Sequence, residues 1–426
     1  ATAHGPDGRH AASHYRVTPK LFELNHSAGE PTIGITKQGY VAVTASAGCV
    51  TSCVGSTETV QTVAPGGRAV FLTRNKGRSW QNVSPGVAGV SPHALSLDPY
   101  LYVDHSPEAN RIFDIDLNAA CNELSYSDNF GATWITNPLS CGEPVNDHQT
   151  VFSGRPVSSP TVGYPAIVYY CFNKLAYTAC TKSLDGGLTF LPTGHLTDPE
   201  CSGLNGHGVT DSRGWVYLPY TGCNSTPTLA ISKDEGTSWT IVHVSPGSKV
   251  NGGDPSVAID KKDNLYYLWN DTTRRPMLSV SRNRGGSWSQ AYSVAAPAVV
   301  RTNLATLTVG APGSLAIAYY GTGSDADKGA FWNGYLAVGL GVLGRHPVFY
   351  SATVNDPRHP LKAGACGPGR CGRVLDFIDV KIAPDGQPWA AYVDACADVC
   401  EKTGVESLHD NAGVIGTLLG APNLAR

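Results

Sequence analysis

The sequence predicts an all-β fold, a single seven-bladed β-propeller with four-stranded blades. Three observations predict it: a turn motif that occurs five times, seven strand–turn–strand units, and a composition rich in turn-forming and aromatic residues. The 426 residues include 48 Gly, 29 Pro, 19 Tyr and 8 Trp, which is typical of short strands separated by frequent turns. No sustained 3.6-residue apolar period is present, so we expect little helix.

The turn motif follows the pattern Ser/Thr-x-Asp/Asn-x-Gly-x-Ser/Thr-aromatic. Its copies are Thr73–Trp80, Ser127–Trp134, Ser183–Phe190, Ser232–Trp239 and Ser281–Trp288. The Asp or Asn side chain can hydrogen-bond its own backbone, Gly accepts a positive φ, and the hydroxyls satisfy turn amides. The aromatic residue is expected to fill the gap between neighbouring sheets. The motif is therefore predicted to be a structural β-hairpin turn.

A second repeat precedes each turn motif and consists of an inner strand, a short turn and another strand. Clear examples are Glu30–Thr36 before Tyr40–Val43, and Asp254–Asp260 before Leu265–Leu268; the others begin at Asp98, Asp147, Asn205, Asn303 and Phe377. Seven units of about 50 residues indicate seven blades. No linker long enough to divide the chain is present.

The last strand is expected near Ala412–Leu419, and the segment Tyr15–Leu21 is expected to add an outer strand to the same blade and close the ring. We therefore predict an N-terminal segment, residues 1–29, followed by a propeller over residues 30–426.

The turn motif resembles the Asp box, or BNR repeat, of the sialidase-like superfamily, and the resemblance covers most of residues 30–420. It implies a propeller with a carbohydrate ligand, with the turns on the rim away from the substrate face. Sialidases, however, have six blades and begin with an Arg-Ile/Leu-Pro motif that opens an arginine triad. This chain has neither feature, so the resemblance does not carry over sialidase chemistry. Seven-bladed relatives include polysaccharide lyases and rhamnosidases that use a His, and also noncatalytic binding and assembly factors.

The cysteines predict a secreted protein held together by local disulfides. There are twelve, and they fall as near neighbours: Cys49 with Cys53, Cys121 with Cys141, Cys171 with Cys180, Cys201 with Cys223, Cys366 with Cys371, and Cys396 with Cys400. Sequence alone does not select one pairing. A zinc site built from the last four thiolates is the alternative. The N-terminal Ala1–Gly5 is interpreted as a mature end left after removal of a signal peptide or, equally, as an artificial boundary of the expressed chain.

Charge and hydropathy exclude two classes of partner. Only 15% of residues are charged and the net charge is −3, so no nucleic-acid partner is expected. No apolar run approaches 18 residues, so no membrane span is expected. Phosphate-binding loops, dinucleotide fingerprints, zincin motifs and nucleophile elbows are also absent from the sequence.

Aligning the seven units places polar residues at the start of most inner strands. The first aligned position reads Glu30, Asp98, Asp147, Asn205, Asp254, Asn303 and Phe377. Two residues further, on the same strand face, stand Thr32, Tyr100, Gln149, His207, Ser256, Ala305 and Asp379. Because inner strands line the centre of a propeller, both sets are expected to surround one mouth of its channel.

This mouth is the predicted functional site. The catalytic candidates are Asp147, His148, His207 and Asp254, because neighbouring carboxylates raise each other's pKa and His exchanges protons near neutral pH. The candidate substrate-binding residues are Glu30, Asp98, Tyr100, Gln149, Asn205, Asn303, Asp379 and His26. No cofactor or metal is required, although the oxygens could also hold Ca²⁺. The competing structural interpretation is that these polar groups only anchor the preceding loops.

The sequence thus predicts a secreted carbohydrate-active enzyme that cleaves glycosidic bonds by hydrolysis or lyase elimination, with a glycan or polysaccharide as its partner. The alternative is a noncatalytic extracellular propeller that binds glycans or proteins, or takes part in surface assembly.

Overall fold

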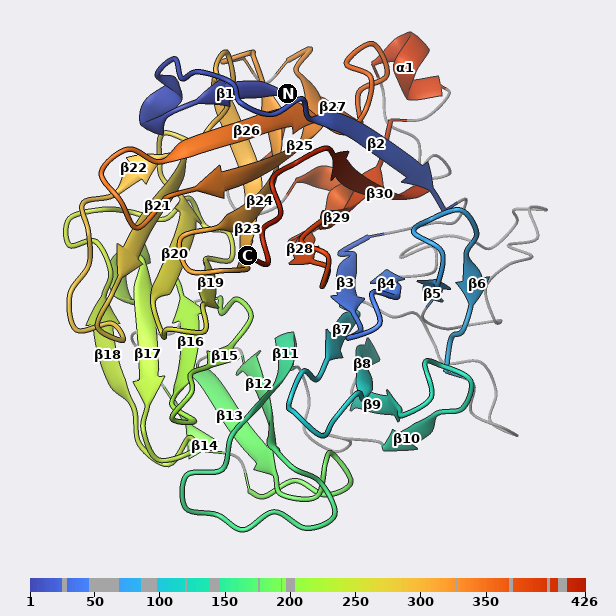
Figure 1. Ribbon diagram of the computed structural model, residues 1–426, viewed down its shortest axis with the longest axis vertical. Helices are drawn as coiled ribbons and strands as arrows, with labels where there is room; N and C mark the ends of the chain where they lie inside the picture. Colours follow the sequence, from blue (N-terminus) through green and yellow to red (C-terminus); the bar gives the residue numbers. More distant parts are fainter. Residues whose placement is uncertain are drawn as a thin grey trace.

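The computed structural model describes residues 1–24, 29–45, 69–85, 98–118, 121–137, 146–174, 177–192, 194–196, 204–326, 328–367, 371–396, 399–404 and 412–426. Seven antiparallel sheets surround a common axis, and each inner strand contacts the inner strand of the next blade (Figure 1). The predicted all-β, seven-bladed propeller is confirmed.

Blades 1 to 4 each contain four consecutive strands. Blade 1 comprises β3 (Thr32–Ile35), β4 (Val41–Ala45), β5 (Ala69–Thr73) and β6 (Gln81–Asn82). Blade 2 comprises β7 (Tyr100–Val103), β8 (Ile112–Asn118), β9 (Cys121–Ser127) and β10 (Ile135–Asn137). Blade 3 comprises β11 (Asp147–Gly154), β12 (Ile167–Lys174), β13 (Tyr177–Ser183) and β14 (Gly194–His195). Blade 4 comprises β15 (Val209–Thr210), β16 (Val216–Tyr220), β17 (Thr228–Ser232) and β18 (Thr240–His243).

Blade 5 also contains four consecutive strands, whereas blades 6 and 7 include strands from the N-terminal segment. Blade 5 comprises β19 (Ser256–Ile259), β20 (Leu265–Asn270), β21 (Pro276–Ser281) and β22 (Tyr292–Ser293). Blade 6 comprises β23 (Arg301–Val309), β24 (Leu315–Thr322), β25 (Phe331–Leu340) and β26 (Val348–Thr353), with β1 (Thr2–His4) beyond β26 and β27 (Lys362–Ala363) beside β25. Blade 7 comprises β28 (Asp379–Ile382), β29 (Pro388–Asp394), β30 (Ala412–Leu419) and β2 (Thr18–Glu23).

Helix is scarce in the described residues: α1 (Val399–Thr403) is the single α-helix, and short 3-10 turns occupy Pro6–Gly8, Cys223–Ser225 and Gly372–Val374. No helix among the described residues is long and apolar enough to cross a membrane.

Blade 7 joins two distant parts of the sequence. Strand β2 pairs with β30 from Thr18↔Leu419 to Glu23↔Val414, and Figure 1 shows the two strands side by side. This pairing links the N-terminal segment to the last blade by backbone hydrogen bonds and closes the ring.

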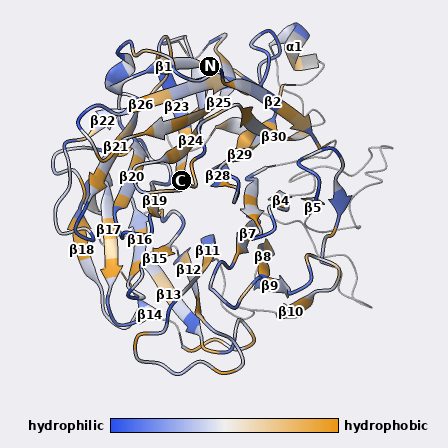
Figure 2. Cartoon of the chain, in the orientation of Figure 1, coloured by the Kyte–Doolittle hydropathy of each residue, from blue (hydrophilic) through white to orange (hydrophobic). Residues whose placement is uncertain are grey.

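The hydrophobic core is divided among the gaps between blades. Seven clusters of buried residues each join two neighbouring blades. Between blades 4 and 5, for example, Tyr217, Tyr267 and Trp269 are at most 1% exposed. Figure 2 shows the corresponding hydrophobic colouring along the strands and hydrophilic colouring at the central ends of β11 and β28. Burial between sheets therefore holds the ring together.

The five repeated turns share one hydrogen-bond pattern. In each, the first hydroxyl accepts the glycine N–H at 2.8–2.9 Å, and the Asp or Asn oxygen accepts the N–H of the seventh residue at 2.8–2.9 Å. The glycine has a positive φ, as predicted, and so does the residue before it, such as Lys76 at 59°. The aromatic residue is half-buried against a cluster between blades, and the Trp134 indole N–H donates to Val83 O of the preceding blade at 2.7 Å.

Polar side chains also connect neighbouring inner strands. The Thr32 hydroxyl accepts Leu101 N–H at 2.8 Å, Ser256 accepts Leu307 N–H at 3.2 Å, and the Asp379 carboxylate accepts Ile33 N–H at 3.2 Å. Thr150 makes the equivalent contact with Gly208 N–H at 3.3 Å. At these positions the polar residue satisfies a backbone amide of the next blade, a structural role other than the predicted anchoring of the preceding loop.

We expect Thr32→Val to lower the free energy of unfolding by about 1–3 kcal/mol, because it leaves Leu101 N–H buried without an acceptor. Thr44 is the cross-strand partner of Thr32, equally buried, and its hydroxyl has no partner among the described residues. Thr44→Val is therefore the matched control, with a change below about 0.5 kcal/mol. Urea denaturation measures both variants; equal losses would contradict the hydrogen-bond argument.

Three of the predicted disulfides lie within the described residues: Cys171–Cys180, Cys366–Cys371 and Cys396–Cys400. In the last two pairs the four sulfurs are bonded as disulfides, so they do not form the alternative four-thiolate zinc site.

The other three predicted disulfides stay predictions. Both cysteines of the first pair, Cys49 and Cys53, lie outside the described residues. In the second pair Cys141 lies outside them, although its predicted partner Cys121 begins β9. In the remaining pair, Cys201 with Cys223, the first cysteine lies outside them as well.

Candidate functional site

Carboxyl groups from several blades meet around one buried histidine, His148. It interacts with Asp98, Asp147 and Asp254, from blades 2, 3 and 5, and with Asp376, just before blade 7. Glu30 of blade 1 joins the group through Asp98 and Asp376. We call these six residues the acid cluster. Four of the carboxyls occupy the first aligned inner-strand position, so the structure brings together residues that the alignment selected.

A β-bulge positions His148. The register between β11 and β12 shifts between Asp147 and Thr150, and His148 has a φ of 49°. Its N–H donates to Asp147 Oδ1 at 3.0 Å, and its carbonyl accepts from Asn205 Nδ2 at 2.8 Å. A bulge redirects a side chain at the cost of one unpaired residue. Here it turns the imidazole toward the centre of the ring.

The bulge also changes which residue stands at the second aligned position of the inner strand, two residues after the first. The inserted residue puts Thr150 where the alignment expected Gln149, and a matching bulge between Asn303 and Thr306 puts Thr306 where it expected Ala305. In both blades the amide or carboxylate before the bulge accepts the next residue's N–H, as Asn303 Oδ1 does from Leu304 at 2.8 Å. Gln149 instead donates to Asp98 O.

His148 is held as an imidazolium. Its Nδ1 lies 2.8 Å from Asp254 Oδ2, its Nε2 lies 3.8 Å from Asp376 Oδ2, and its side chain is 2% exposed. Burial alone would lower its pKa, but the carboxylates of Asp254, Asp147 and Asp98 outweigh burial and raise the pKa to about 10. Both ring nitrogens therefore carry protons at neutral pH.

Glu30 and Asp98 hold a proton between them. Burial and the neighbouring Asp98 raise the pKa of Glu30 well above its usual value, while burial and Asp147 raise the pKa of Asp98 to about 7. Glu30 Oε1 accepts the Asp376 N–H at 3.1 Å, and Glu30 is 1% exposed. Two carboxyls in contact cannot both ionise in a buried site, so Glu30 is the protonated partner.

Asp254 borders a small cavity. The described residues enclose about 20 Å³ there, lined by His207, Asp254, Ser256, Thr306, Asp376 and Phe377, among others. Asp254 Oδ2 binds His148, whereas its buried Oδ1 has no hydrogen-bond partner among the described residues. Burial raises the pKa of Asp254 and the imidazolium of His148 opposes that rise. A cavity of this size accommodates about one water molecule.

His207 lies beside the cavity in an aromatic environment. Its ring centroid is 4.3 Å from that of Tyr100 and 5.6 Å from that of Phe377. Burial lowers its pKa to about 4, so it is neutral where His148 is charged. The two histidines predicted as candidates thus have opposite electrostatic environments, although both contact Phe377.

Other predicted site residues have structural partners. Asp379 accepts Ile33 N–H and lies 2.7 Å from Lys381 Nζ, and Asn205 binds the backbone of His148. Asn303 Nδ2 donates to Gly367 O at 3.0 Å. These contacts do not test ligand binding, so the predicted binding roles of Asp379, Asn205 and Asn303 stay predictions. His26 lies outside the described residues.

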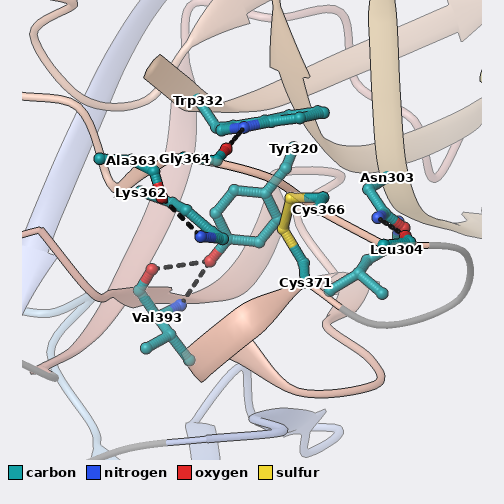
Figure 3. The surroundings of a disulfide bond; sticks show 11 residues. Asn303, Leu304, Tyr320, Trp332, Lys362, Ala363, Gly364, Cys366, Cys371 and Val393 are labelled. Atoms are coloured by element: carbon teal, nitrogen blue, oxygen red, sulfur yellow. Dashed lines mark hydrogen bonds between the residues drawn. A yellow bond between two sulfur atoms is a disulfide. The ribbon is translucent and has the colours of Figure 1, made fainter. Parts of the chain in front are cut away.

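Sequence alignment missed Asp376. In the seventh unit the aligned position is apolar Phe377, and the carboxylate stands one residue earlier. Asp376 follows a loop fixed by the Cys366–Cys371 disulfide, and Figure 3 shows this disulfide near Asn303 and Leu304 of blade 6. Glu30 N–H donates to Val374 O at 3.3 Å on the other side. The sequence signal for this site residue was an acidic side chain directly before the aligned Phe377.

The described His, Cys, Asp and Glu side chains form no group of three or more that could hold a metal ion.

Comparisons with known proteins place the chain among propellers. No family model matches it. A xyloglucanase from Paenibacillus sp is 25% identical over 257 residues, which cover 53% of this chain and 23% of that protein. The chain thus spans about a quarter of the length of the curated relative it matches.

Among solved structures, the BP39L lectin from Burkholderia pseudomallei has a TM-score of 0.55 and 10% identity, and the match covers 87% of this chain and 94% of that chain. A NanB sialidase from Streptococcus pneumoniae has a TM-score of 0.45 and 12% identity over 93% of this chain and 70% of that chain. At 10% identity the likeness to the lectin shows the fold alone.

Proposed function

We propose that this chain is a secreted, carbohydrate-active propeller that hydrolyses glycosidic bonds at the acid cluster. The observation that carries the proposal is the environment of Asp254. One of its oxygens is held by the imidazolium of His148, and the other is buried without a partner among the described residues, beside a cavity of about 20 Å³. A carboxylate beside a site for one water is what a general base for hydrolysis requires.

The remaining groups supply the other half of an acid–base mechanism. The Glu30–Asp98 pair retains a proton because of its raised pKa values. Pairs of carboxyls whose pKa values are separated by their surroundings take the roles of acid and base in glycosidases. In this proposal Asp254 activates water, the Glu30–Asp98 pair supplies a proton, and His148 keeps Asp254 oriented and charged.

Electrostatics favour an uncharged substrate. Five carboxyl groups surround the one imidazolium of the cluster, so a sialic or uronic acid would meet like charge. This disfavours lyase elimination, which acts on uronates. The xyloglucanase likeness is compatible with a neutral polysaccharide, and the disulfides support secretion.

The test is a panel of neutral and acidic polysaccharides, with reducing ends and unsaturated-uronate absorbance both recorded. We expect release of reducing ends from a neutral glycan. Asp254→Asn should lower the rate by at least about 100-fold and His207→Ala by at least about tenfold. His243→Ala, on the exposed strand β18, is the control that retains activity. Melting temperatures establish that each variant is folded. Undiminished activity in Asp254→Asn would contradict the proposal.

Noncatalytic glycan binding is the second candidate. The cavity beside Asp254, as lined by the described residues, is smaller than a sugar ring. This observation favours a buried cluster that stabilises the ring while another surface binds the glycan. Measurable affinity for a glycan, with no cleavage of any panel member, would select this function.

A further inference from the structure

A basic groove lies between blades 5 and 6, away from the acid cluster. It has a volume of about 670 Å³ and is lined by the β21–β22 segment, the β25–β26 turn and the 3-10 turn at Pro6–Gly8. The N-terminal turn is fixed in place, because β1 pairs with β26 and Asp7 Oδ1 accepts Ser293 N–H at 3.0 Å. The groove is therefore bordered by three ordered segments.

The charges along this groove are unbalanced. Three exposed arginines line it, Arg9, Arg282 and Arg345, whereas Asp7 is its one carboxylate among the described residues. Asp7 lies 3.6 Å from Arg9 and already accepts Ser293 N–H. Within the described part of the chain, neither Arg282 nor Arg345 forms an ion pair with a carboxylate. Two guanidinium groups thus remain for a ligand.

Tyr292, an aromatic residue of the groove wall, has a buried hydroxyl. The Tyr292 hydroxyl is inaccessible to solvent and forms no hydrogen bond to any described residue. Its ring packs against Phe349, with centroids 6.4 Å apart. Val342, Leu343 and Pro347 supply an apolar side to the same groove. Two guanidinium groups without a carboxylate partner among the described residues, beside an apolar wall, favour an oxygen-rich anionic ligand.

We propose that this groove binds acidic saccharides through their sulfate or carboxylate groups. Arg282 and Arg345 would bind the oxyanion, since the guanidinium fork matches its geometry, and the apolar side would contact the sugar ring. The volume lies in the range of small-ligand sites, about 300–1,000 Å³. The site does not depend on the proposed hydrolysis, because it shares no residue with the acid cluster.

The experiment uses three probes with one backbone: dextran oligosaccharides of equal length that are unmodified, sulfated or carboxymethylated. Isothermal titration calorimetry at low salt measures their affinity for the full chain. We expect binding of at least one anionic form and none of the unmodified form. Arg282→Ala and Arg345→Ala should each weaken binding by about tenfold or more.

Arg74→Ala is the matched control, because Arg74 occupies the position of Arg282 in the equivalent turn of blade 1. It removes the same charge and should leave the affinity unchanged. Equal weakening by Arg74→Ala and Arg345→Ala would overturn the site in favour of general charge attraction. Binding of neither anionic probe would overturn it outright. The two anionic arms distinguish sulfate from carboxylate recognition.

Discussion

Replacing His148 with glutamine should lower the free energy of unfolding by about 3–5 kcal/mol, the cost of removing one partner from a buried ion pair. The imidazolium is 2% exposed and lies 2.8 Å from one carboxylate and 3.8 Å from another. Without its charge, Asp254 must either remain buried as an uncompensated anion or take up a proton. Either outcome destabilises the folded chain at neutral pH.

Glu30→Gln is the matched control for this substitution. Glu30 is buried in the same cluster but is already protonated, because its pKa is raised well above the usual value. A glutamine amide can donate to Asp98 and accept Asp376 N–H as the protonated acid does, so we expect a loss below about 1 kcal/mol. Urea denaturation near pH 7 measures both variants. Comparable losses in the two would mean that packing, rather than the charge of His148, stabilises the cluster.

The ring could be predicted from sequence because its determinants are local and repeated. A turn such as Ser232–Trp239 needs a hydroxyl, an Asp and a Gly at fixed spacing to satisfy its own amides, so the residues themselves reveal the turn. The inner strands repeat with a similar spacing. Counting these units therefore predicted the number of blades, and aligning them brought Glu30, Asp98 and Asp254 to one end of the axis.

The details of the site could not be predicted because they depend on departures from the repeat. An alignment of strands assumes a period of two residues, and the bulge at His148 adds one residue without a sequence signal of its own. Asp376 lies outside the strand pattern, at the end of the disulfide-linked loop. The alignment also could not distinguish Asp379, which accepts an amide of the next blade, from Asp254, whose second oxygen has no partner among the described residues.

Stability should fall as pH rises from about 7 to about 9.5, by up to about 3 kcal/mol from the titration of one buried group. The pKa of His148 is about 10 in the folded chain, against the ordinary histidine value of 6.5. A group whose pKa is raised by folding stabilises the folded state fully below its unfolded pKa, and this contribution is lost as pH rises through the folded pKa. For His148 the loss therefore begins near pH 6.5 and ends near pH 10.

The titration of Asp98 also lowers the stability of the folded chain as pH rises, but in a lower pH range. The pKa of Asp98 is raised from 3.8 to about 7. The stability that Asp98 contributes is therefore largely lost by the pH at which the contribution of His148 begins to fall. The buried tyrosines, such as Tyr220 with a pKa raised to about 12, ionise above the chosen range. Glu30, whose pKa is also raised well above its usual value, can lose its proton in this range and lower stability in the same direction. Urea denaturation of the Glu30→Gln variant at about pH 7, 8 and 9.5 should therefore isolate His148. The free energy of unfolding should fall with rising pH in the Glu30→Gln variant and should change much less in the His148→Gln variant. An identical decline in both variants would assign the titration to another group and would remove the imidazolium from the cluster.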